Sequence, residues 1–188
     1  MKKYVGNCSD AFDWDQIISK FDEQQVSHKK YEEGSTASKE IDDAWAESKE
    51  SVDFFTYHTG EAYDPDLDKR FGEWIGCEPY MAWFSKMATG KSCGQHEDKE
   101  IAERIESEGK NMNDFVRYHV HVTEPCMGGV LIIEKDCYHM EDKGSVWEWS
   151  SPDALHLGVN AGHKTKVLYH FVGTVSYTHL RAHETPVN

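Results

Sequence analysis

Three polar side chains in the segment ALHLGVNAGHKTK, residues 154–166, have types and spacing suited to chemistry. His156, Asn160 and Lys166 lie at offsets of zero, four and ten, on what the pattern predicts to be two short strands joined by a turn. In a small barrel, consecutive strands can bring such an imidazole and such an ammonium group into one interior. The imidazole can then bind a metal ion, while the ammonium group holds a carboxylate of a ligand.

A second imidazole and a carboxylate lie upstream, at His96 and Asp98 in the segment GQHEDKE. Their two-residue step places both side chains on the same side of an extended segment. About two His-x-Asp or His-x-Glu matches are expected by chance in this composition, and the other match is His139 with Glu141. His139 precedes His156 by only 17 residues, whereas His96 precedes it by 60, which leaves room for strands that could bring the two together. The alternative is a solvated turn in which Asp98 caps the following helix.

The segment DFVRYHVHV, residues 114–122, has a clear strand alternation. Phe115, Arg117, His119 and His121 point to one side, and the other side carries Val116, Tyr118, Val120 and Val122. Two imidazoles and a guanidinium group on one face predict a polar interior face, which needs a ligand or an ion to satisfy it. The alternative is an edge strand with these side chains in solvent.

Two imidazoles and one carboxylate on one face of Fe(II) leave adjacent positions open for a bidentate keto acid and dioxygen. His96, Asp98 and His156 are the candidate set. The far carboxylate of the keto acid then needs a cation, and Lys166 suits this role because it lies on the strand after His156. Lys164 has the same strand parity as Lys166, so the choice between the two lysines stays open, and a solvated lysine at the barrel rim is the alternative.

The elements that must position these side chains are mostly strands. From Tyr80 onward, six short segments are rich in β-branched and aromatic residues and are separated by Gly, Pro, Asp or Ser. They are YMAWFSKMA, DFVRYHVHV, GGVLIIE, GSVWEWS, ALHLGV and KVLYHFVG. Helices are predicted over Asp66–Ile75 and Asp98–Gly109. The predicted fold class is therefore mainly β with flanking helices, as a jelly roll or cupin-like antiparallel barrel.

Three regions are expected along the chain. Residues 1–79 are predicted to form a helical, polar N-terminal extension that packs on the barrel and includes a solvated connector over residues 29–43. Residues 80–174 are predicted to form the barrel domain. Residues 175–188 follow a complete final strand and have neither strand alternation nor a helical face, so we expect a non-native or disordered tail.

Composition limits the classes of partner. The 188 residues are enough for one domain with a buried core. A formal net charge of −14 argues against non-specific binding to nucleic acid or to an anionic membrane surface. The five cysteines contain no Cys-x-x-Cys pair and no apolar run is long enough to span a bilayer, so we expect a reduced, cytoplasmic setting with no membrane anchor. The sequence does not indicate the oligomeric state.

The chain resembles the aspartyl/asparaginyl β-hydroxylase-like branch of the Fe(II)/2-oxoglutarate-dependent dioxygenases, in its small phage and metagenomic form, over roughly residues 80–173. That pattern is an iron-binding His, often followed two residues later by Asp, then an Arg-x-His strand, a Gly-led strand, and His-x-x-x-Asn-x-x-x-x-x-Arg or Lys. The matching residues are His96 and Asp98, Arg117 and His119, Gly144, and His156, Asn160 and Lys166.

The resemblance implies a double-stranded β-helix that binds Fe(II) and 2-oxoglutarate. The implied residues are an iron-binding set of His96, Asp98 and His156, and a keto-acid-binding Lys166 assisted by His119 or Arg117. The implied reaction is hydroxylation of an unidentified protein side chain or small molecule, with release of succinate and CO2. The chain departs from the branch in two ways: it has Lys where the branch usually has Arg, and a polar insert, KEIAERIESEGKN, lengthens the gap after His96.

Two other functions stay open. A cupin would bind metal through a different set, of which only the last residue is shared with the oxygenase: His119, His121, Glu124 and His156. A metal-free β-sandwich binding module would use the same histidines as ordinary polar interior residues.

Overall fold

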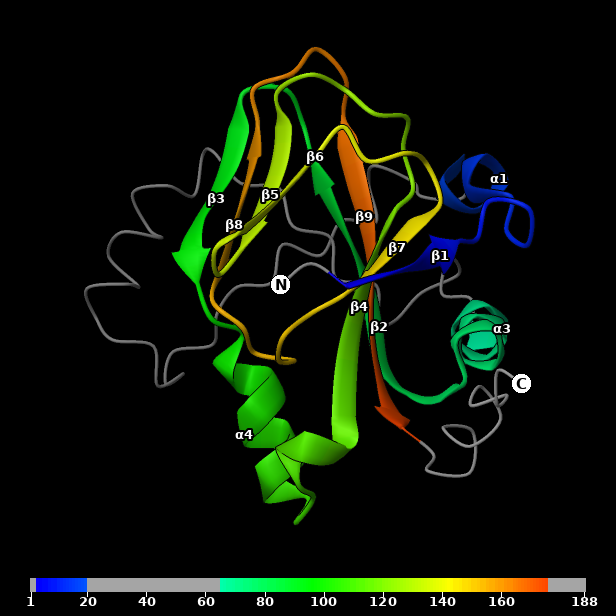
Figure 1. Ribbon diagram of the computed structural model, residues 1–188, viewed down its shortest axis with the longest axis vertical. Coiled ribbons are helices and arrows are strands. Elements are labelled where there is room, and N and C mark those ends of the chain that lie inside the picture. Colours follow the sequence, from blue (N-terminus) through cyan, green and yellow to red (C-terminus); the bar gives the residue numbers. More distant parts are fainter. Residues whose placement is uncertain (1–2, 20–64, 176–188) are drawn as a thin grey trace, which may run out of the picture.

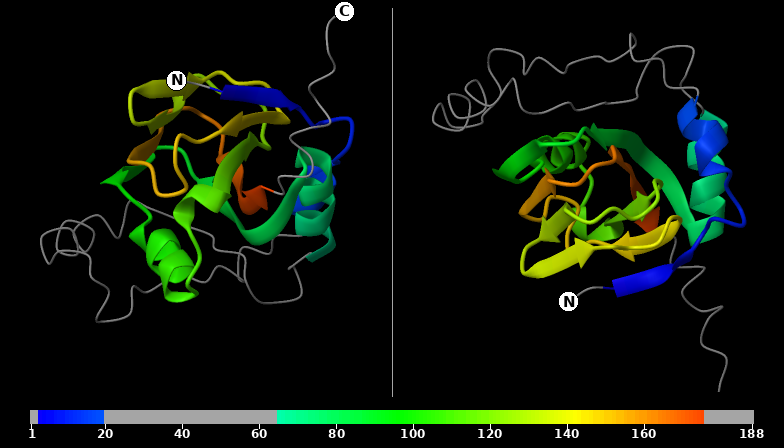
Figure 2. Two further views of the ribbon diagram at one scale, coloured as in Figure 1. Left: turned by 60° about the horizontal axis from the view of Figure 1, so that its bottom comes forward. Right: turned by 90° about the horizontal axis from the view of Figure 1, so that it is seen from above.

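The protein is built from two antiparallel sheets that face each other. The computed structural model describes residues 3–19 and 65–175, and Figure 1 shows the elements in colour. One sheet has five strands, in the order β1 (Lys3–Asn7), β7 (Ser145–Glu148), β4 (Phe115–His121), β9 (Lys166–Val175) and β2 (Cys77–Met87). The other has four, in the order β3 (Lys91–His96), β8 (His156–Asn160), β5 (Gly129–Ile133) and β6 (Asp136–His139). Seen from above in Figure 2, the strands of both sheets curve around a common interior.

This architecture confirms the predicted fold class, a mainly β jelly roll of the double-stranded β-helix type with flanking helices. The six predicted strand segments correspond to β2, β4, β5, β7, β8 and β9. The strands β1, β3 and β6 were not predicted. Two of them are edge strands of the four-stranded sheet, and KSCGQH in β3 is polar and contains glycine, so it lacks the composition by which strands are recognised.

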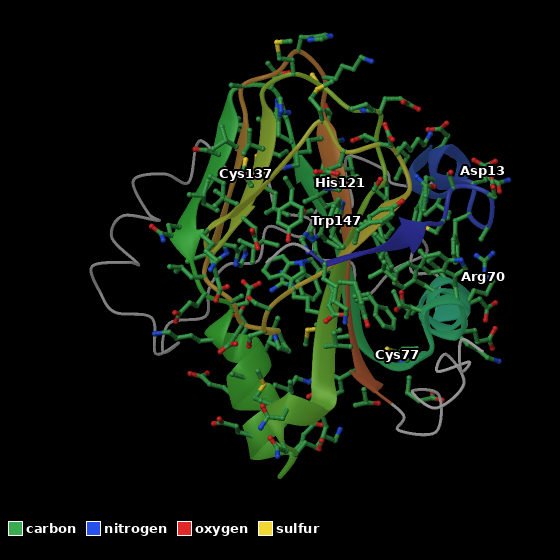
Figure 3. All side chains as sticks on the ribbon, in the orientation of Figure 1. Asp13, Arg70, Cys77, His121, Cys137 and Trp147 are labelled. Atoms are coloured by element: carbon green, nitrogen blue, oxygen red, sulfur yellow. The ribbon has the colours of Figure 1, made fainter. Side chains whose placement is uncertain are left out.

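The alternation of β4 separates two environments. Tyr118, Val120 and their neighbours on the outer side belong to the largest apolar cluster, which the helices α1 (Trp14–Ser19) and α3 (Pro65–Ile75) cover. Arg117, His119 and His121 lie on the inner side and are buried. Figure 3 labels His121 and Trp147 between the two sheets. The predicted polar interior face is therefore present, and the alternative of an exposed edge strand is wrong, because β4 is the central strand of its sheet.

The helix α3 is held on the sheet mainly by Phe71, which is fully buried and lies with its ring centroid 5.3 Å from Tyr169 and 5.1 Å from Phe171. We expect Phe71→Ala to lower the free energy of unfolding by about 3–5 kcal/mol because it leaves a cavity in the main core. Trp74→Ala, on the same helix but 36% exposed, should cost about 1–2 kcal/mol. Urea unfolding measures both, and equal losses would contradict this account of the core.

The helix α4 (Lys99–Ser107) matches the prediction over Asp98–Gly109. It buries Ile101 and Ile105 against Phe115 at one end of the barrel. The turn after the helix uses Gly109, whose φ of +70° suits glycine. The polar insert is thus a helix that begins directly after Asp98 and fixes the position of that residue.

The glycine that directly precedes β7, Gly144, is required for a steric reason. Gly144 has a φ of +83°, and a Cβ atom there would lie 2.6 Å from Asn7 Oδ1 and 2.7 Å from Ser9 N. Only glycine allows β1 to approach this turn and pair with β7. Residues 3–7 therefore belong to the five-stranded sheet, although the N-terminal region was expected to be helical.

Some expectations lie outside the described residues. These are the solvated connector at 29–43 and the tail beyond Val175. The division into an extension of residues 1–79 and a barrel of residues 80–174 stays a prediction. Within the described ranges, the helices are all too short or too polar to cross a bilayer.

Candidate metal centre and barrel interior

The pairing of β3 with β8 brings together two histidines that are 60 residues apart in sequence. His96 and His156 are direct Cα partners in the antiparallel register, after an irregularity between Cys93 and His96. Their ring centroids are 4.1 Å apart. Asp98 follows His96 by two residues. Its Oδ1 lies 3.4 Å from His96 Nε2, and its Oδ2 lies 3.6 Å from His156 Nε2. One ligand atom from each of the three residues lies within 4.8 Å of the others.

Both histidines are oriented by the backbone. His156 Nδ1 lies 2.9 Å from the carbonyl oxygen of Ala154, and His96 Nδ1 lies 2.8 Å from that of Gly94. A carbonyl only accepts, so each Nδ1 donates, and each Nε2 faces Asp98, where it would offer its lone pair to a metal ion once the ring is neutral. A hydrogen bond from the far ring nitrogen to a backbone carbonyl is the usual way in which proteins orient metal-binding imidazoles.

Asp98 occupies the N-cap position of α4, but its side chain makes no capping hydrogen bond. Its carboxylate instead accepts a hydrogen bond of 2.6 Å from Arg117 Nη1. The alternative in which Asp98 is a solvated cap is therefore wrong. Burial would raise the pKa of Asp98, but the positive charge of Arg117 and the hydrogen bond with His96 hold it well below its usual range. The carboxylate is ionised, as a metal ligand must be.

The two imidazoles differ in their affinity for protons. Burial opposes charge on both. At His96, hydrogen bonds with Asp98 and Cys93 overcome this effect and raise the pKa to about 10. At His156, burial and the positive charge of Arg117 lower the pKa to about 3. A metal ion would therefore find His156 neutral and would displace one proton from His96 on binding.

The position of the Arg117 side chain is fixed by burial, two aromatic rings and hydrogen bonds. Arg117 is 1% exposed, its Cζ atom lies 3.6 Å from the ring centroid of Trp149 and 4.6 Å from that of Trp83, and Nη1 also donates to the carbonyl of Pro152 at 2.9 Å. The guanidinium group thus fixes the Asp98 carboxylate from a rigid position. Its predicted part in keto-acid binding stays a prediction.

Lys166 lies inside the barrel, 8% exposed, whereas Lys164 is exposed in the preceding turn. Burial lowers the pKa of Lys166 to about 7, and no carboxylate among residues 3–19 and 65–175 offsets this effect. Of the two candidate lysines, only Lys166 can meet a ligand in the interior. A buried ammonium group without a counter-ion in the described part of the chain is a strong reason to expect an anionic ligand.

His119 and His121 lie on the same inner face as Lys166, with ring centroids 5.1 Å apart. His119 is fully buried, and its Nδ1 accepts a hydrogen bond of 2.8 Å from Trp149 Nε1. Its other nitrogen, Nε2, is buried with no hydrogen-bond partner in the described structure. His119 therefore offers a polar atom to a ligand in the interior.

No protein-family model matches the sequence, and no curated protein matches it. Solved structures similar to the chain include the viral collagen prolyl hydroxylase vCPH of Paramecium Bursaria Chlorella virus-1 in a 2OG complex, which is 15% identical with a TM-score of 0.40 over 72% of this chain and 88% of that one. A Pseudomonas putida prolyl-4-hydroxylase is 14% identical with a TM-score of 0.37, over 72% of this chain and 78% of that one.

Cupins are also among the similar structures. A cupin domain from Bordetella pertussis Tohama I is 11% identical with a TM-score of 0.34, over 54% of this chain and 95% of that one. No match at the level of sequence supports the aspartyl/asparaginyl branch in particular. Oxygenases and cupins share this type of barrel, so the function must be inferred from the site.

The cupin ligand set is not gathered. Glu124 is exposed and its nearest ion-pair partner is Lys143, at 4.0 Å. Of the four residues in the cupin set, His119 already accepts a hydrogen bond at Nδ1 from Trp149 Nε1. Among the described residues, the His96, Asp98 and His156 group is the only one in which three potential ligands converge.

Sequence reasoning missed the role of two residues. Asn160 is fully buried and ties the turn between β8 and β9, because Nδ2 donates to the carbonyls of Met87 and Lys164 and Oδ1 accepts from Gly162 N. It thereby places the start of β9, and Lys166, at the barrel interior. Trp149 is buried in an apolar cluster, and it also contacts the polar site. Its strand parity was visible in the sequence, but its hydrogen bond was not.

Proposed function

We propose that the protein is an Fe(II)/2-oxoglutarate-dependent oxygenase that hydroxylates a small molecule or a side chain of a peptide or protein. The observation that carries the proposal is the convergence of two backbone-oriented imidazoles and an ionised carboxylate beside a barrel interior that contains an uncompensated lysine. His96, Asp98 and His156 are the proposed iron ligands. Lys166, assisted by His119, is the proposed keto-acid-binding residue.

The donor set fits iron. Two imidazole nitrogens and one carboxylate oxygen suit Fe(II) and leave positions for other ligands, whereas closed structural zinc sites use four protein ligands. Because Arg117 holds Oδ2 of Asp98 at 2.6 Å, Oδ1 is the oxygen left for a metal ion. Bound Fe(II) would supply the activation of dioxygen that couples oxidation of the substrate to decarboxylation of 2-oxoglutarate.

The charges of the interior fit a dianion. The positive charge of Arg117 offsets the negative charge of Asp98, so a divalent ion in the site would keep its full positive charge. Lys166 adds a further positive charge to the interior. A dicarboxylate placed between the two would satisfy both. Lys166 lies four residues before His170 on β9, and His170 Nδ1 is 3.4 Å from Arg117 Nη2. The Cδ atom of Lys166 lies 3.7 Å from the position of a Cβ atom at Gly129, and Gly129 is four residues along β5 from Ile133, the Cα partner of His156. The lysine thus lies farther along the interior than the proposed ligands, where it would meet the far carboxylate of a keto acid.

The side chains of the protein divide the remaining work. Lys166 and His119 bind and orient the keto acid from inside the barrel. Arg117 holds the carboxylate of Asp98, and the indoles of Trp83 and Trp149, which both pack against the guanidinium group, help to exclude water from that ion pair. Such a dry, rigid setting strengthens the electrostatic interactions of the site.

The proposal is tested with the full chain, by incubation with 2-oxoglutarate, ascorbate and oxygen, with and without added Fe(II). Uncoupled turnover requires no knowledge of the substrate. We expect Fe(II)-dependent succinate, detected by mass spectrometry, together with one metal ion per chain. Absence of both metal binding and succinate would favour the metal-free binding module, whereas metal binding without succinate would favour a cupin.

Binding of 2-oxoglutarate should depend on pH through Lys166. Its pKa in the ligand-free protein is lowered to about 7, and a bound carboxylate raises it again. Below pH 7 the lysine is already charged and affinity is highest. Above pH 7 binding must take up a proton, so affinity should fall by up to about tenfold per pH unit.

Calorimetry of the Mn(II)-saturated protein in two buffers of different ionisation enthalpy measures both the affinity and the proton uptake. Saturation with metal keeps the proton of His96 out of the measurement. Lys164→Met, which removes the exposed neighbouring lysine, should leave the pH profile unchanged. An affinity that is constant from pH 6 to pH 9 would show that Lys166 does not pair with the keto acid.

A further inference from the structure

One indole group touches both the proposed metal centre and the barrel interior. Trp149 is 3% exposed. The centroid of its ring lies 3.6 Å from the Cζ atom of Arg117 and 4.7 Å from the ring centroid of His156. Its Nε1 donates to His119 Nδ1 at 2.8 Å. The backbone N–H of Trp149 also bonds to the carbonyl of Arg117 at 2.8 Å, so the position of this side chain is tied to β4.

The hydrogen bond from Trp149 determines where His119 carries its proton. An indole N–H can only donate, so Nδ1 of His119 must accept. An imidazolium has a proton on both nitrogens, so a ring that accepts at Nδ1 is neutral and carries its proton on Nε2. His119 therefore offers an N–H donor at Nε2, and this atom is buried with no hydrogen-bond partner in the described structure.

A second buried histidine shows the same arrangement with its donor satisfied. His170 is the Cα partner of His119 on β9, and its Nδ1 lies 3.4 Å from Arg117 Nη2, which can only donate. Its Nε2 consequently donates to Ser85 Oγ, at 2.9 Å. Both rings thus accept a hydrogen bond at Nδ1. Of the two, only His119 has an Nε2–H group with no acceptor in the described structure. An unsatisfied buried donor is costly, and its presence points to an acceptor on a ligand.

We infer that Trp149 is a positioning residue, which fixes the Nε2–H tautomer of His119 and so directs a neutral donor at a carboxylate oxygen of the keto acid, beside Lys166. In the other tautomer, His119 would present a lone pair to the anion and repel it. The identity of the ligand rests on the proposed function, whereas the tautomer does not.

The tautomer is measured on the ligand-free protein by long-range 1H–15N correlation of the histidine side chains. We expect wild-type His119 to show a protonated Nε2 and an unprotonated Nδ1. Trp149→Phe keeps an aromatic ring beside Arg117 but removes the N–H, so His119 should change to a mixture of tautomers. A protonated Nδ1 in the wild-type protein overturns the inference, even if the variant fails to fold.

Binding separates a positioning role from a purely structural one. In the Mn(II)-loaded protein, Trp149→Phe should raise the Kd of 2-oxoglutarate about tenfold, as expected for one lost hydrogen bond to a charged group. The Kd of Mn(II) itself should change less than about twofold, because the proposed ligands keep their own hydrogen bonds. A structural defect would instead weaken both.

Trp147→Phe is the matched control, since Trp147 lies two residues away on β7 and Trp149 already occupies Nδ1 of His119. It should retain the wild-type tautomer and keto-acid affinity. Equal loss of affinity in both variants, or an unchanged tautomer in Trp149→Phe, overturns the inference. If the wild-type protein binds no 2-oxoglutarate, the proposed function fails, and the tautomers of the two variants still decide whether Trp149 positions His119.

Discussion

Replacing His96 with alanine should reduce Fe(II)-dependent succinate formation by at least about a hundredfold and remove most bound iron. His96 supplies one of only two imidazoles in the cluster, and its Nε2 lies 3.4 Å from Asp98 Oδ1. Without it, His156 and Asp98 remain, and a pair of ligands holds Fe(II) weakly. Metal content by mass spectrometry and succinate formation from 2-oxoglutarate measure the effect.

The matched control is His139→Ala. His139 begins the other His-x-Glu or His-x-Asp pair of the sequence, but it is exposed at the end of β6, outside the cluster. Iron content and turnover should stay at the wild-type level. If His96→Ala keeps its metal and the wild-type protein forms no succinate, the cupin hypothesis is favoured and the proposed triad is wrong.

The fold could be predicted from the sequence because its central strands have two chemically different faces. In β4, histidines and arginine alternate with valines and tyrosine, so the residue types alone distinguish the inner side of this strand from the outer side. The edge strand β3 gave no such signal. Its polar residues face solvent in part, and its pairing with β8 depends on a partner 60 residues away.

The candidate ligands could be proposed from spacing, but the choice between His96 and His139 could not be made from the two pairs themselves. Both are followed by an acid two residues later. The decision comes from the register of β3 on β8, which sets His96 directly opposite His156. Register is a property of two strands together, and the sequence of one strand does not contain it.

The contacts that tune the site were beyond sequence reasoning. Strand parity showed that Arg117 faces inward, but not that it would bind Asp98, because that contact depends on the path of α4. Likewise, the alternation of GSVWEWS puts Trp149 and Trp147 on one side, yet the hydrogen bond of Trp149 joins the residue after β7 to His119 on β4. Such interactions arise from packing between elements, and local sequence patterns do not encode them.

Lys166→Met should abolish measurable binding of 2-oxoglutarate and, at the same time, make the protein more stable. The substitution removes the buried charge that pairs with the far carboxylate, so we expect the Kd to rise by at least about a hundredfold. It also replaces an uncompensated ammonium group with an apolar side chain of similar length. Because burial alone lowers the pKa of Lys166 to about 7, removing the lysine should raise the free energy of unfolding by about 1–4 kcal/mol near neutral pH.

The opposite signs of these two effects are the diagnostic result, since a substitution that merely damages the barrel lowers affinity and stability together. The stability gain should be largest below pH 7, where wild-type folding must bury a charged lysine, and should shrink as the pH rises toward 10 and the folded protein holds the lysine neutral. Calorimetric binding and urea unfolding, with Lys164→Met as the exposed control, measure both quantities. A Lys166→Met protein that is less stable at every pH, or that still binds 2-oxoglutarate tightly, would mean that Lys166 has a structural partner rather than a ligand.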